Sequence, residues 1–288
     1  MSLYIYNLKN LPKLNKPIFM IGSFESFHAG HNLLYEKAKE INSDINNPRD
    51  IVIVYFSDVE QMPKNAGKKF TDHMFRLNSF AHLGFKHALK LDYKLIRGLS
   101  PDDFIDLIID KQDDFDIVIG ADFKYGINGS GDVKTLKARF KNKIHSIDIM
   151  KLNNEQKVST SFIKEALIAG DIDLVNLLNL YKYGFNARVY KQSDVLNIEF
   201  DQDLVPMRPG VYSVNIIIED TSYYALLLIT NDNKRQIEMI DFQWTSLSKH
   251  ECQIIVHSFL RPFFINSQQE SNDDDFKRAK EYFAFLLK

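Results

Sequence analysis

The stretch PIFMIGSFESFHAGHNLLYEKAKEI, residues 17–41, joins an apolar run to a polar loop and then to an amphipathic segment. Its first six residues are almost continuously apolar, as in a strand that is buried on both faces. The segment from about residue 30 to residue 42 has the spacing of a helix. A strand, a short loop and a helix in this order predict one unit of a parallel sheet that helices cover.

Three further apolar runs repeat this strand pattern: IVIVYF at 51–56, FDIVIG at 115–120 and IHSIDIM at 144–150. Between them the sequence predicts helices over about residues 73–89, 101–112 and 132–142. Ser100 is the expected N-cap of the second helix, and Pro101 its first residue. The alternation predicts a doubly wound parallel sheet of the Rossmann-like kind, in which ligands bind beyond the carboxyl ends of the strands.

The pattern changes after about residue 159. Residues 159–180 predict two short helices that break at Gly170 and Asp171, and Asp171 can cap the second. From Tyr183 onward, six short β-rich runs are separated by clusters of turn-forming residues, which predicts a small antiparallel barrel or sandwich. Residues 271–288 predict a closing helix. We therefore expect two domains, 1–182 and 183–288.

Composition limits the class of protein. The 288 residues carry a formal charge of −2, which argues against a general nucleic-acid binder. The single cysteine, Cys252, cannot form an internal disulfide and fits a reducing compartment. No apolar run approaches the roughly 18 residues of a membrane span. We expect a cytoplasmic protein with small-molecule partners, no nucleic acid and no membrane; the sequence does not indicate its oligomeric state.

The loop GSFESFHAGH, residues 22–31, is a competent phosphate site. Free backbone N–H groups and the positive end of the following helix favour an anion, and Gly22 and Gly30 let a ligand approach the backbone. His28 and His31 share one helical face. Their imidazoles could donate hydrogen bonds to phosphate oxygens, they could bind a metal, or the loop could simply be polar.

Four segments together resemble the bacterial FAD synthetases, which are H-x-G-H nucleotidylyltransferases commonly fused to a riboflavin kinase. GSFESFHAGH resembles that family's G-x-F-D-G-x-H-x-G-H signature. VIGADFKYGINGSGD (118–132) is similar to its G-x-D-F-x-F-G…G-D segment, and KVSTSFIKEALIAGDI (157–172) to its S-S-T-x-I-R element. LSPDDFI (99–105) looks like its S-P-x-x-F helix start. The matches are in the family's order and span about residues 17–183.

This resemblance implies an FMN adenylyltransferase, in which FMN attacks the α-phosphorus of ATP to give FAD and pyrophosphate, with Mg²⁺ sharing the charge. It implies that His28 and His31 are catalytic and hold the phosphates of ATP. The implied nucleotide-binding residues are Gly22, Ser23, Phe24, Gly30, Ser159, Thr160, Ser161 and Lys164. The run at 159–161 is equally a plain helix N-cap, and both roles can coexist. The ligands of the metal are not implied.

The resemblance places the flavin beside Asp122, Phe123, Lys124 and Tyr125; the alternative is a turn whose aromatic residues pack inward. Three positions depart from the family pattern. Glu25 stands in place of Asp, and Ser26 in place of Gly. Lys164 replaces Arg, which keeps the charge but loses the bidentate fork.

PMRPGVYSV (206–214), EMIDF (238–242) and FLRPF (259–263) resemble the riboflavin kinase module. That module carries a glycine-rich loop followed by P-T-A-N. Here the matching place reads DVLN, so Asn197 survives, while Val195 stands where Thr would offer an oxygen to Mg²⁺. The glycine-rich loop is missing. Glu238 matches the kinase base, although an exposed strand glutamate is an equal interpretation. Asn197 and Glu238 would thus be vestiges of an impaired or lost kinase.

Three other functions remain open from the sequence. The chain could retain both activities, it could adenylylate another phosphate-bearing acceptor, or it could be a non-catalytic flavin or nucleotide-binding protein.

Overall fold

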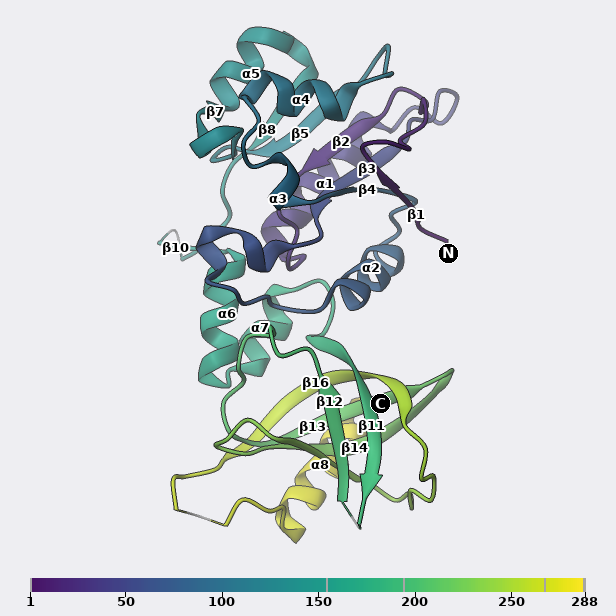
Figure 1. The fold of residues 1–288 in the computed structure, drawn as a ribbon, viewed down its shortest axis with the longest axis vertical. Helices are drawn as coiled ribbons and strands as arrows, with labels where there is room; N and C mark the ends of the chain where they lie inside the picture. The colour runs from purple at the N-terminus through teal and green to yellow at the C-terminus, as the bar shows by residue number, and fades with distance from the viewer. Residues whose placement is uncertain (1, 154, 194, 267, 287–288) are drawn as a thin grey trace. The chain divides into compact units, whose positions relative to one another are not determined.

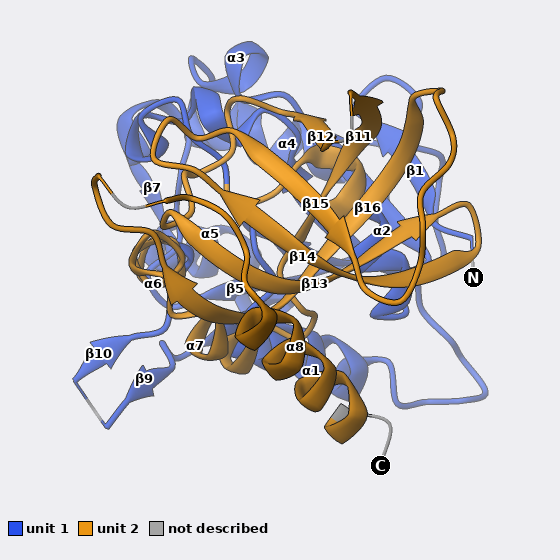
Figure 2. Ribbon diagram, turned by 90° about the horizontal axis from the view of Figure 1, so that it is seen from below, with its two compact units in different colours: residues 1–69, 76–160 blue, residues 70–75, 161–288 orange. Residues whose placement is uncertain are grey.

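The computed structural model describes residues 2–153, 155–193, 195–266 and 268–286 of the chain (Figure 1). The chain divides into two compact units (Figure 2). Unit 1 comprises Met1–Lys69 and Arg76–Thr160, and unit 2 comprises Phe70–Phe75 and Ser161–Lys288. The domain boundary expected at 182/183 remains a prediction. The two compact units are each made of separate segments of the chain, so they do not test a single boundary in the sequence.

Unit 1 contains a six-stranded sheet in the order β1-β4-β3-β2-β5-β8. All neighbouring pairs are parallel, which confirms the doubly wound fold. The strands are β1 (Tyr4–Asn7), β2 (Ile18–Ile21), β3 (Ile51–Phe56), β4 (His87–Leu91), β5 (Asp116–Gly120) and β8 (Ile144–Ile147). From β2 the chain proceeds to β3 and β4 on one side and later to β5 and β8 on the other, so the strand order reverses at β2.

Helices connect these strands. The α-helices of unit 1 are α1 (Ala29–Ile41), α2 (His73–His82), α3 (Tyr93–Ile96), α4 (Pro101–Ile109) and α5 (Val133–Phe140), the first residues of α2 belonging to unit 2. Short 3-10 turns are η1 (Val59–Gln61), η2 (Pro63–Asn65), η3 (Ile127–Gly129) and η4 (Lys141–Lys143). Two small hairpins are formed by β6 (Lys124–Tyr125) with β7 (Gly131–Asp132), and by β9 (Lys151–Leu152) with β10 (Gln156–Lys157). Ser100 caps α4 as predicted, accepting from the N–H of Asp103.

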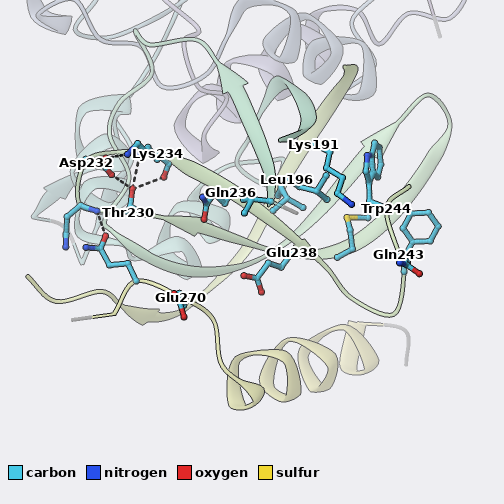
Figure 3. Close-up of a pocket in the computed structure, with 16 residues that line it drawn as sticks. Lys191, Leu196, Thr230, Asp232, Lys234, Gln236, Glu238, Gln243, Trp244 and Glu270 are labelled. Carbon is cyan, nitrogen blue, oxygen red and sulfur yellow. Dashed lines mark hydrogen bonds and ion pairs between the residues drawn. The ribbon is translucent and has the colours of Figure 1, made fainter. Parts of the chain in front are cut away.

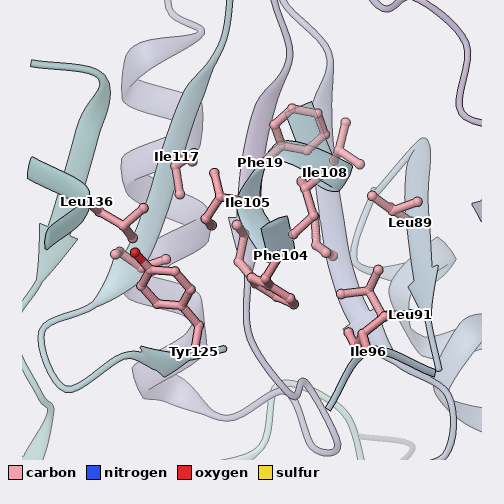
Figure 4. Close-up of a cluster of buried hydrophobic side chains, with 14 of the residues drawn as sticks. Phe19, Leu89, Leu91, Ile96, Phe104, Ile105, Ile108, Ile117, Tyr125 and Leu136 are labelled. Atoms are coloured by element: carbon pink, nitrogen blue, oxygen red, sulfur yellow. The ribbon is translucent and has the colours of Figure 1, made fainter. Parts of the chain in front are cut away.

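The core of unit 1 explains why the strands read as continuous apolar runs. Phe19 and Ile117 on the strands are fully buried, and they belong to one cluster with Phe104, Ile105 and Ile108 of α4 (Figure 4). Strands covered on both faces have no solvent side on which polar residues would alternate.

The helix predicted over 73–89 is wrong in its second half. Helix α2 ends at His82, Gly84 has a left-handed φ of +93°, and His87–Leu91 is strand β4. Ala88 and Leu89 are fully buried there, between β1 and β3. Tertiary burial outweighs the helical spacing of this segment, and the glycine provides the exit from the helix. His87 therefore lies on a strand, with its Nε2 3.4 Å from a carboxylate oxygen of Asp50.

Unit 2 is built on a closed six-stranded barrel in the order β11-β12-β15-β14-β13-β16, which confirms the predicted barrel. Its strands are β11 (Gly184–Gln192), β12 (Val195–Phe200), β13 (Gly210–Ile218), β14 (Thr221–Ile229), β15 (Arg235–Met239) and β16 (His250–Pro262). Its helices are α6 (Thr160–Ala169), of which Thr160 belongs to unit 1, α7 (Ile172–Leu178) and the C-terminal α8 (Asp273–Leu286). Asp171 caps α7 as predicted, accepting from the N–H of Leu174 at 3.1 Å.

A segment from far upstream, Phe70–Phe75, belongs to the barrel unit (Figure 2). The hydroxyl of Thr71 donates to the carbonyl oxygen of Gly184 at 2.6 Å. The carboxylate of Asp72, which is 9% exposed, accepts from the backbone N–H of Asn186 at 2.7 Å. These contacts join residues more than 110 positions apart, so sequence spacing alone did not predict them.

The barrel encloses a guanidinium. Arg235 is 2% exposed, and its Cζ lies 3.7 Å from the ring centroid of Phe200 and 4.7 Å from that of Phe185. Within the described part of the chain, none of its three side-chain nitrogens has a hydrogen-bond partner. Burial lowers the pKa of Arg235 to about 10, which still leaves the group charged at neutral pH.

Candidate active site

The loop between β2 and α1 lies at the carboxyl end of β2, where the strand order reverses and doubly wound sheets bind ligands. His28 has extended backbone angles, and it is the N-cap residue of α1. Its Nδ1 accepts a hydrogen bond from the backbone N–H of His31 at 3.3 Å. The predicted junction of strand, loop and helix is therefore present, with a histidine in the capping position that Ser, Thr, Asp or Asn usually occupies.

The two imidazoles stack on each other. Their ring centroids are 3.8 Å apart and their planes differ by 16°. The Nδ1 of His31 lies 3.0 Å from the carbonyl oxygen of Ser26, and because a carbonyl only accepts, this nitrogen carries a proton. The Nδ1 of His28 accepts, so a neutral His28 carries its proton on Nε2. One ring thus has a free N–H and the other a free lone pair.

Burial keeps both rings neutral. Removal from water, and to a smaller extent the charge of Lys157, lower the pKa of His28 to about 4. Burial, followed by the neighbouring His28, holds the pKa of His31 well below its ordinary range. The rings of Phe24 and Phe27, both fully buried, lie 4.8 and 5.8 Å from the ring of His31 and supply this apolar surrounding. At neutral pH the pair offers hydrogen bonds rather than positive charge.

The glycines of the loop leave room for these rings. A Cβ on Gly30 would lie 3.1 Å from the ring of His28, and a Cβ on Gly22 would lie 3.1 Å from the ring of Phe24. Phe24 itself has a positive φ of 41°, which a phenylalanine adopts only where its surroundings fix it. The shape of the loop therefore depends on small residues at both ends.

Two residues of the predicted Ser-Thr-Ser run belong to the same unit as the histidines. Helix α6 begins at Thr160, and the hydroxyl of Thr160 lies 2.8 Å from that of Ser26. Ser159 immediately precedes it and is partly buried. Ser161 and Lys164 belong to unit 2, and their approach to the phosphates remains a prediction.

The predicted flavin side has mixed surroundings. Tyr125 packs inward against Phe104 and hydrogen-bonds Thr135 through its hydroxyl, which is the alternative that the sequence left open. Phe123 stacks on it with planes 11° apart and stays partly buried. Asp122 and Lys124 are exposed, paired with Lys157 and Asp132 respectively. Only Phe123 of the two aromatic side chains keeps surface that a ring could contact.

Sequence analysis missed a buried polar contact beneath the loop. Glu25 is 1% exposed, and its carboxylate accepts from the amide Nδ2 of Asn65 at 3.1 Å. The same nitrogen donates to the carbonyl oxygen of Val59 at 2.7 Å. The departure from the family pattern at Glu25 was the available signal, but its partner lies 40 positions away.

The chain itself offers no closed metal site in the residues described: no group of three or more His, Cys, Asp or Glu gathers there. Mg²⁺ commonly binds through one or two carboxylates together with substrate phosphates and water. The donor set at the histidine loop, two neutral imidazoles, does not suit this cation.

A hollow lies in unit 2, with a volume of about 1040 Å³ (Figure 3). Thr230, Asp232 and Lys234 stand at one end, with Lys191 and Trp244 at the other. Val195 and Glu238 contribute to the lining, and Asn197 is not among the lining residues. The hydroxyl of Ser271 donates to the carboxylate of Glu238.

The place expected for a glycine-rich loop is a hairpin. Strands β11 and β12 remain paired as far as Gln192 and Val195, so only residues 193 and 194 join them, and residue 194 lies outside the described residues. Val195 presents a hydrocarbon surface, 41% exposed, to the hollow. No described helix of the chain is both long and apolar enough to span a bilayer.

A doubly wound sheet with a phosphate-competent loop at its switch point is an architecture that binds nucleotides. Residues 11–162 match the family model described as FAD synthetase. The chain belongs to the FAD synthetase family.

Curated relatives extend the likeness beyond this segment. A "Bifunctional riboflavin kinase/FMN adenylyltransferase" from Bacillus subtilis is 29% identical over 301 residues, covering 95% of this chain and 94% of the relative. A "Trifunctional protein RibF/MnmA" from Mycoplasmoides gallisepticum is 26% identical over 98% of this chain, which spans only 43% of that longer protein.

One solved structure shares the fold over nearly the full length. A protein described as a macrolide-efflux protein from Streptococcus pneumoniae superimposes with a TM-score of 0.79 at 16% identity, covering 98% of each chain. At this identity the likeness concerns the fold alone.

Proposed function

We propose that the chain makes FAD by transferring the adenylyl group of ATP to FMN. A phosphate oxygen of FMN forms a bond to the α-phosphorus of ATP. The bond from that phosphorus to the oxygen bridging to the β-phosphorus breaks, and pyrophosphate leaves with the electron pair. The observation that carries the proposal is the stacked pair of neutral imidazoles at the N-terminus of α1, in a chain of the FAD synthetase family.

In this proposal the protein acts by positioning and by stabilising charge, without a covalent intermediate. His28 donates from Nε2 to a phosphate oxygen of ATP, and His31 lies beside it in the same stack. The loop that contains Gly22, Ser23, Phe24 and Gly30 receives the nucleotide; the N–H of Gly22 itself donates to the carbonyl oxygen of Val54, so Gly22 contributes by leaving room. Ser159, Thr160, Ser161 and Lys164 complete the phosphate side. Asp122, Phe123 and Lys124 form the flavin side, and Tyr125 supports it by stacking on Phe123.

Mg²⁺ would enter with the nucleotide, bound mainly by its phosphates, and would share the negative charge of the reacting groups. This fits a chain whose described residues gather no carboxylate cluster of their own. A cytoplasmic location and the absence of a nucleic-acid partner likewise remain proposals.

We further propose that the barrel has lost riboflavin kinase activity. The hairpin between β11 and β12 supports this, because two residues cannot form a glycine-rich loop around a triphosphate. Val195 supports it as well, since a valine offers no oxygen to a metal. Glu238 in the hollow speaks for the alternative, a chain that keeps both activities as the names of its relatives suggest.

Product analysis separates these proposals. Purified protein is incubated with ATP and Mg²⁺ and with either FMN or riboflavin, and flavins are resolved by chromatography. We expect FAD from FMN and no FMN from riboflavin. The absence of FAD beside an active reference enzyme would refute adenylyl transfer, and FMN from riboflavin would refute the loss of the kinase. Other mononucleotide acceptors offered in parallel test the choice of flavin.

A further inference from the structure

We infer that Lys64 is a phosphate-binding cation of the adenylyl-transfer site and holds the pyrophosphate part of ATP. This inference rests on the proposed function and adds a residue that neither the sequence motifs nor the family resemblance indicated. Lys64 lies in the connection after β3, in the 3-10 turn η2, far from the histidine loop in sequence.

The first observation is where the ammonium group lies. The Nζ of Lys64 is 3.4 Å from the hydroxyl oxygen of Ser23, so it reaches the loop that receives the nucleotide. Its positive charge also contributes to lowering the pKa of His31. Lys64 therefore stands within the electrostatic field of the helix end at which an anion would bind.

The second observation is that the backbone carrying Lys64 is fixed from beneath. The next residue, Asn65, is 8% exposed and donates its amide to both Glu25 and the carbonyl oxygen of Val59. Its backbone N–H donates to the carbonyl oxygen of Met62 at 2.9 Å. Glu25 belongs to the histidine loop, so one buried hydrogen bond ties the Lys64 turn to the loop it serves.

The third observation is a second lysine from a different segment. Lys157 on β10 lowers the pKa of both His28 and His31, whereas the charge of Lys64 acts on His31. Lys157 is paired with the carboxylate of Asp122. The charges of two lysines from separate segments thus act on an imidazole pair that carries no charge of its own.

These observations assign different roles to the histidines and the lysines. Neutral imidazoles can donate hydrogen bonds but cannot balance the charge of a polyphosphate, so on the protein side that charge is balanced by the lysines and the helix N-terminus, beside the Mg²⁺ that would enter with the nucleotide. As the bond to the α-phosphorus breaks, negative charge grows on the departing pyrophosphate. A cation already placed at Ser23 stabilises that charge without moving far.

The test measures pyrophosphate binding directly. Titration calorimetry with inorganic pyrophosphate is carried out on the wild type, on Lys64→Met and on Lys64→Arg. We expect Lys64→Met to weaken binding by about tenfold or more, as for a lost hydrogen bond to a charged group, and Lys64→Arg to restore most of it. Lys68→Met, which removes the same charge from an exposed residue of the same connection, is the matched control and should bind as the wild type does.

Kinetics give the second readout. Lys64→Met should lower kcat/KM for ATP by a similar factor and leave the KM for FMN unchanged, with an unaltered melting temperature. Asn65→Ala, which loosens the turn but keeps the lysine, should give a smaller loss. Equal pyrophosphate affinity in Lys64→Met and the wild type would overturn the inference, as would an equal loss in Lys68→Met. If the wild type makes no FAD and Lys64→Met still binds pyrophosphate more weakly than the wild type, the proposed adenylyl transfer to FMN is refuted, while the assignment of Lys64 to phosphate binding stands.

Discussion

His28 accepts the backbone N–H of His31 through Nδ1 while its ring covers the ring of the same residue, with centroids 3.8 Å apart. The backbone and the side chain of His31 are therefore both held by a single imidazole. The two rings form one unit whose geometry is set before any nucleotide arrives, which is the preorganisation that charge stabilisation requires.

The first prediction concerns this pair. His28→Ala removes a transition-state donor, and His31→Ala removes the ring on which that donor stacks, so each should lower kcat for FAD formation by on the order of 10²-fold or more. His82→Ala, which removes an exposed histidine of α2, should leave kcat unchanged. Steady-state kinetics with FMN and ATP measure the effect. Unchanged rates in both site variants would show that the roles are misassigned.

Gly30→Ala distinguishes the effect of the position of the His28 ring on activity from the effect of helix propensity on the free energy of unfolding. Alanine is a better helix former than glycine by about 1 kcal/mol, so the free energy of unfolding should hold or rise. The new Cβ would lie 3.1 Å from the His28 ring and displace it, so we expect kcat to fall by about tenfold. Gly98→Ala is the control, because a Cβ there meets nothing within 4 Å. A fully active Gly30→Ala enzyme would contradict the role of the fixed ring.

Stability should fall as the solution becomes acidic. Burial lowers the pKa of both His28 and His257 to about 4, whereas an unfolded histidine titrates near 6.5. Between these two pKa values both histidines are protonated in the unfolded chain and neutral in the folded chain, so acidification favours unfolding. The stabilisation is therefore complete above about pH 6.5 and is lost as the pH falls through 4.

Between pH 6.5 and pH 5 each histidine should account for about 1–2 kcal/mol of this loss. Urea unfolding at several pH values measures it. His257→Gln should flatten the dependence, because glutamine does not titrate. An identical slope in the wild type and in this variant would show that His257 does not bear the shift. The rate of FAD formation should remain level from pH 8 to about 6.5, since both site rings stay neutral there.

Variants of Arg235 measure how much the buried positive charge of the barrel lowers the free energy of unfolding. Burying a charge without hydrogen-bond partners is costly, and replacing even a buried ion pair by well-packed apolar side chains is often neutral or stabilising by about 1–4 kcal/mol. Arg235→Met should therefore unfold at the same or a higher urea concentration than the wild type. Arg235→Ala leaves a cavity beside Phe200 and should be less stable by about 2 kcal/mol or more. Equal losses in both variants would mean that the charge itself stabilises the barrel.

Sequence analysis located the strands whose burial is visible in the local sequence as a run of apolar residues. β2, β3 and β5 are apolar runs covered on both faces, and they were predicted within a few residues. The edge strand β8, of which only Ile144 is buried, was also predicted within a few residues. β1 has two exposed apolar side chains, Tyr4 and Ile5, in a short edge strand, so no run or alternation marks it. β4 follows a helix within five residues and continues its spacing, and only the packed sheet decides its conformation.

The candidate site divides in the same way. The histidine loop was predicted because its residues are neighbours in the sequence. Its ability to bind phosphate follows from its place between the end of a strand and the N-terminus of a helix. The bond between Glu25 and Asn65 and the approach of Lys64 to Ser23 join segments about 40 positions apart. Such contacts exist only once the sheet has brought its strand ends together, so no local pattern announces them.

The membership of Phe70–Phe75 in the barrel unit has a consequence for the gene. The polypeptide passes from one compact unit to the other after Lys69, after Phe75 and after Thr160, so a single protease cut cannot yield two intact halves. If the coding sequence were split near codon 160, the barrel would lose residues 70–75. Two of these residues, Thr71 and Asp72, hydrogen-bond the backbone carbonyl oxygen of Gly184 and the backbone N–H of Asn186. That interleaving gives a physical reason, independent of any activity of the barrel, for both units to stay on the same chain.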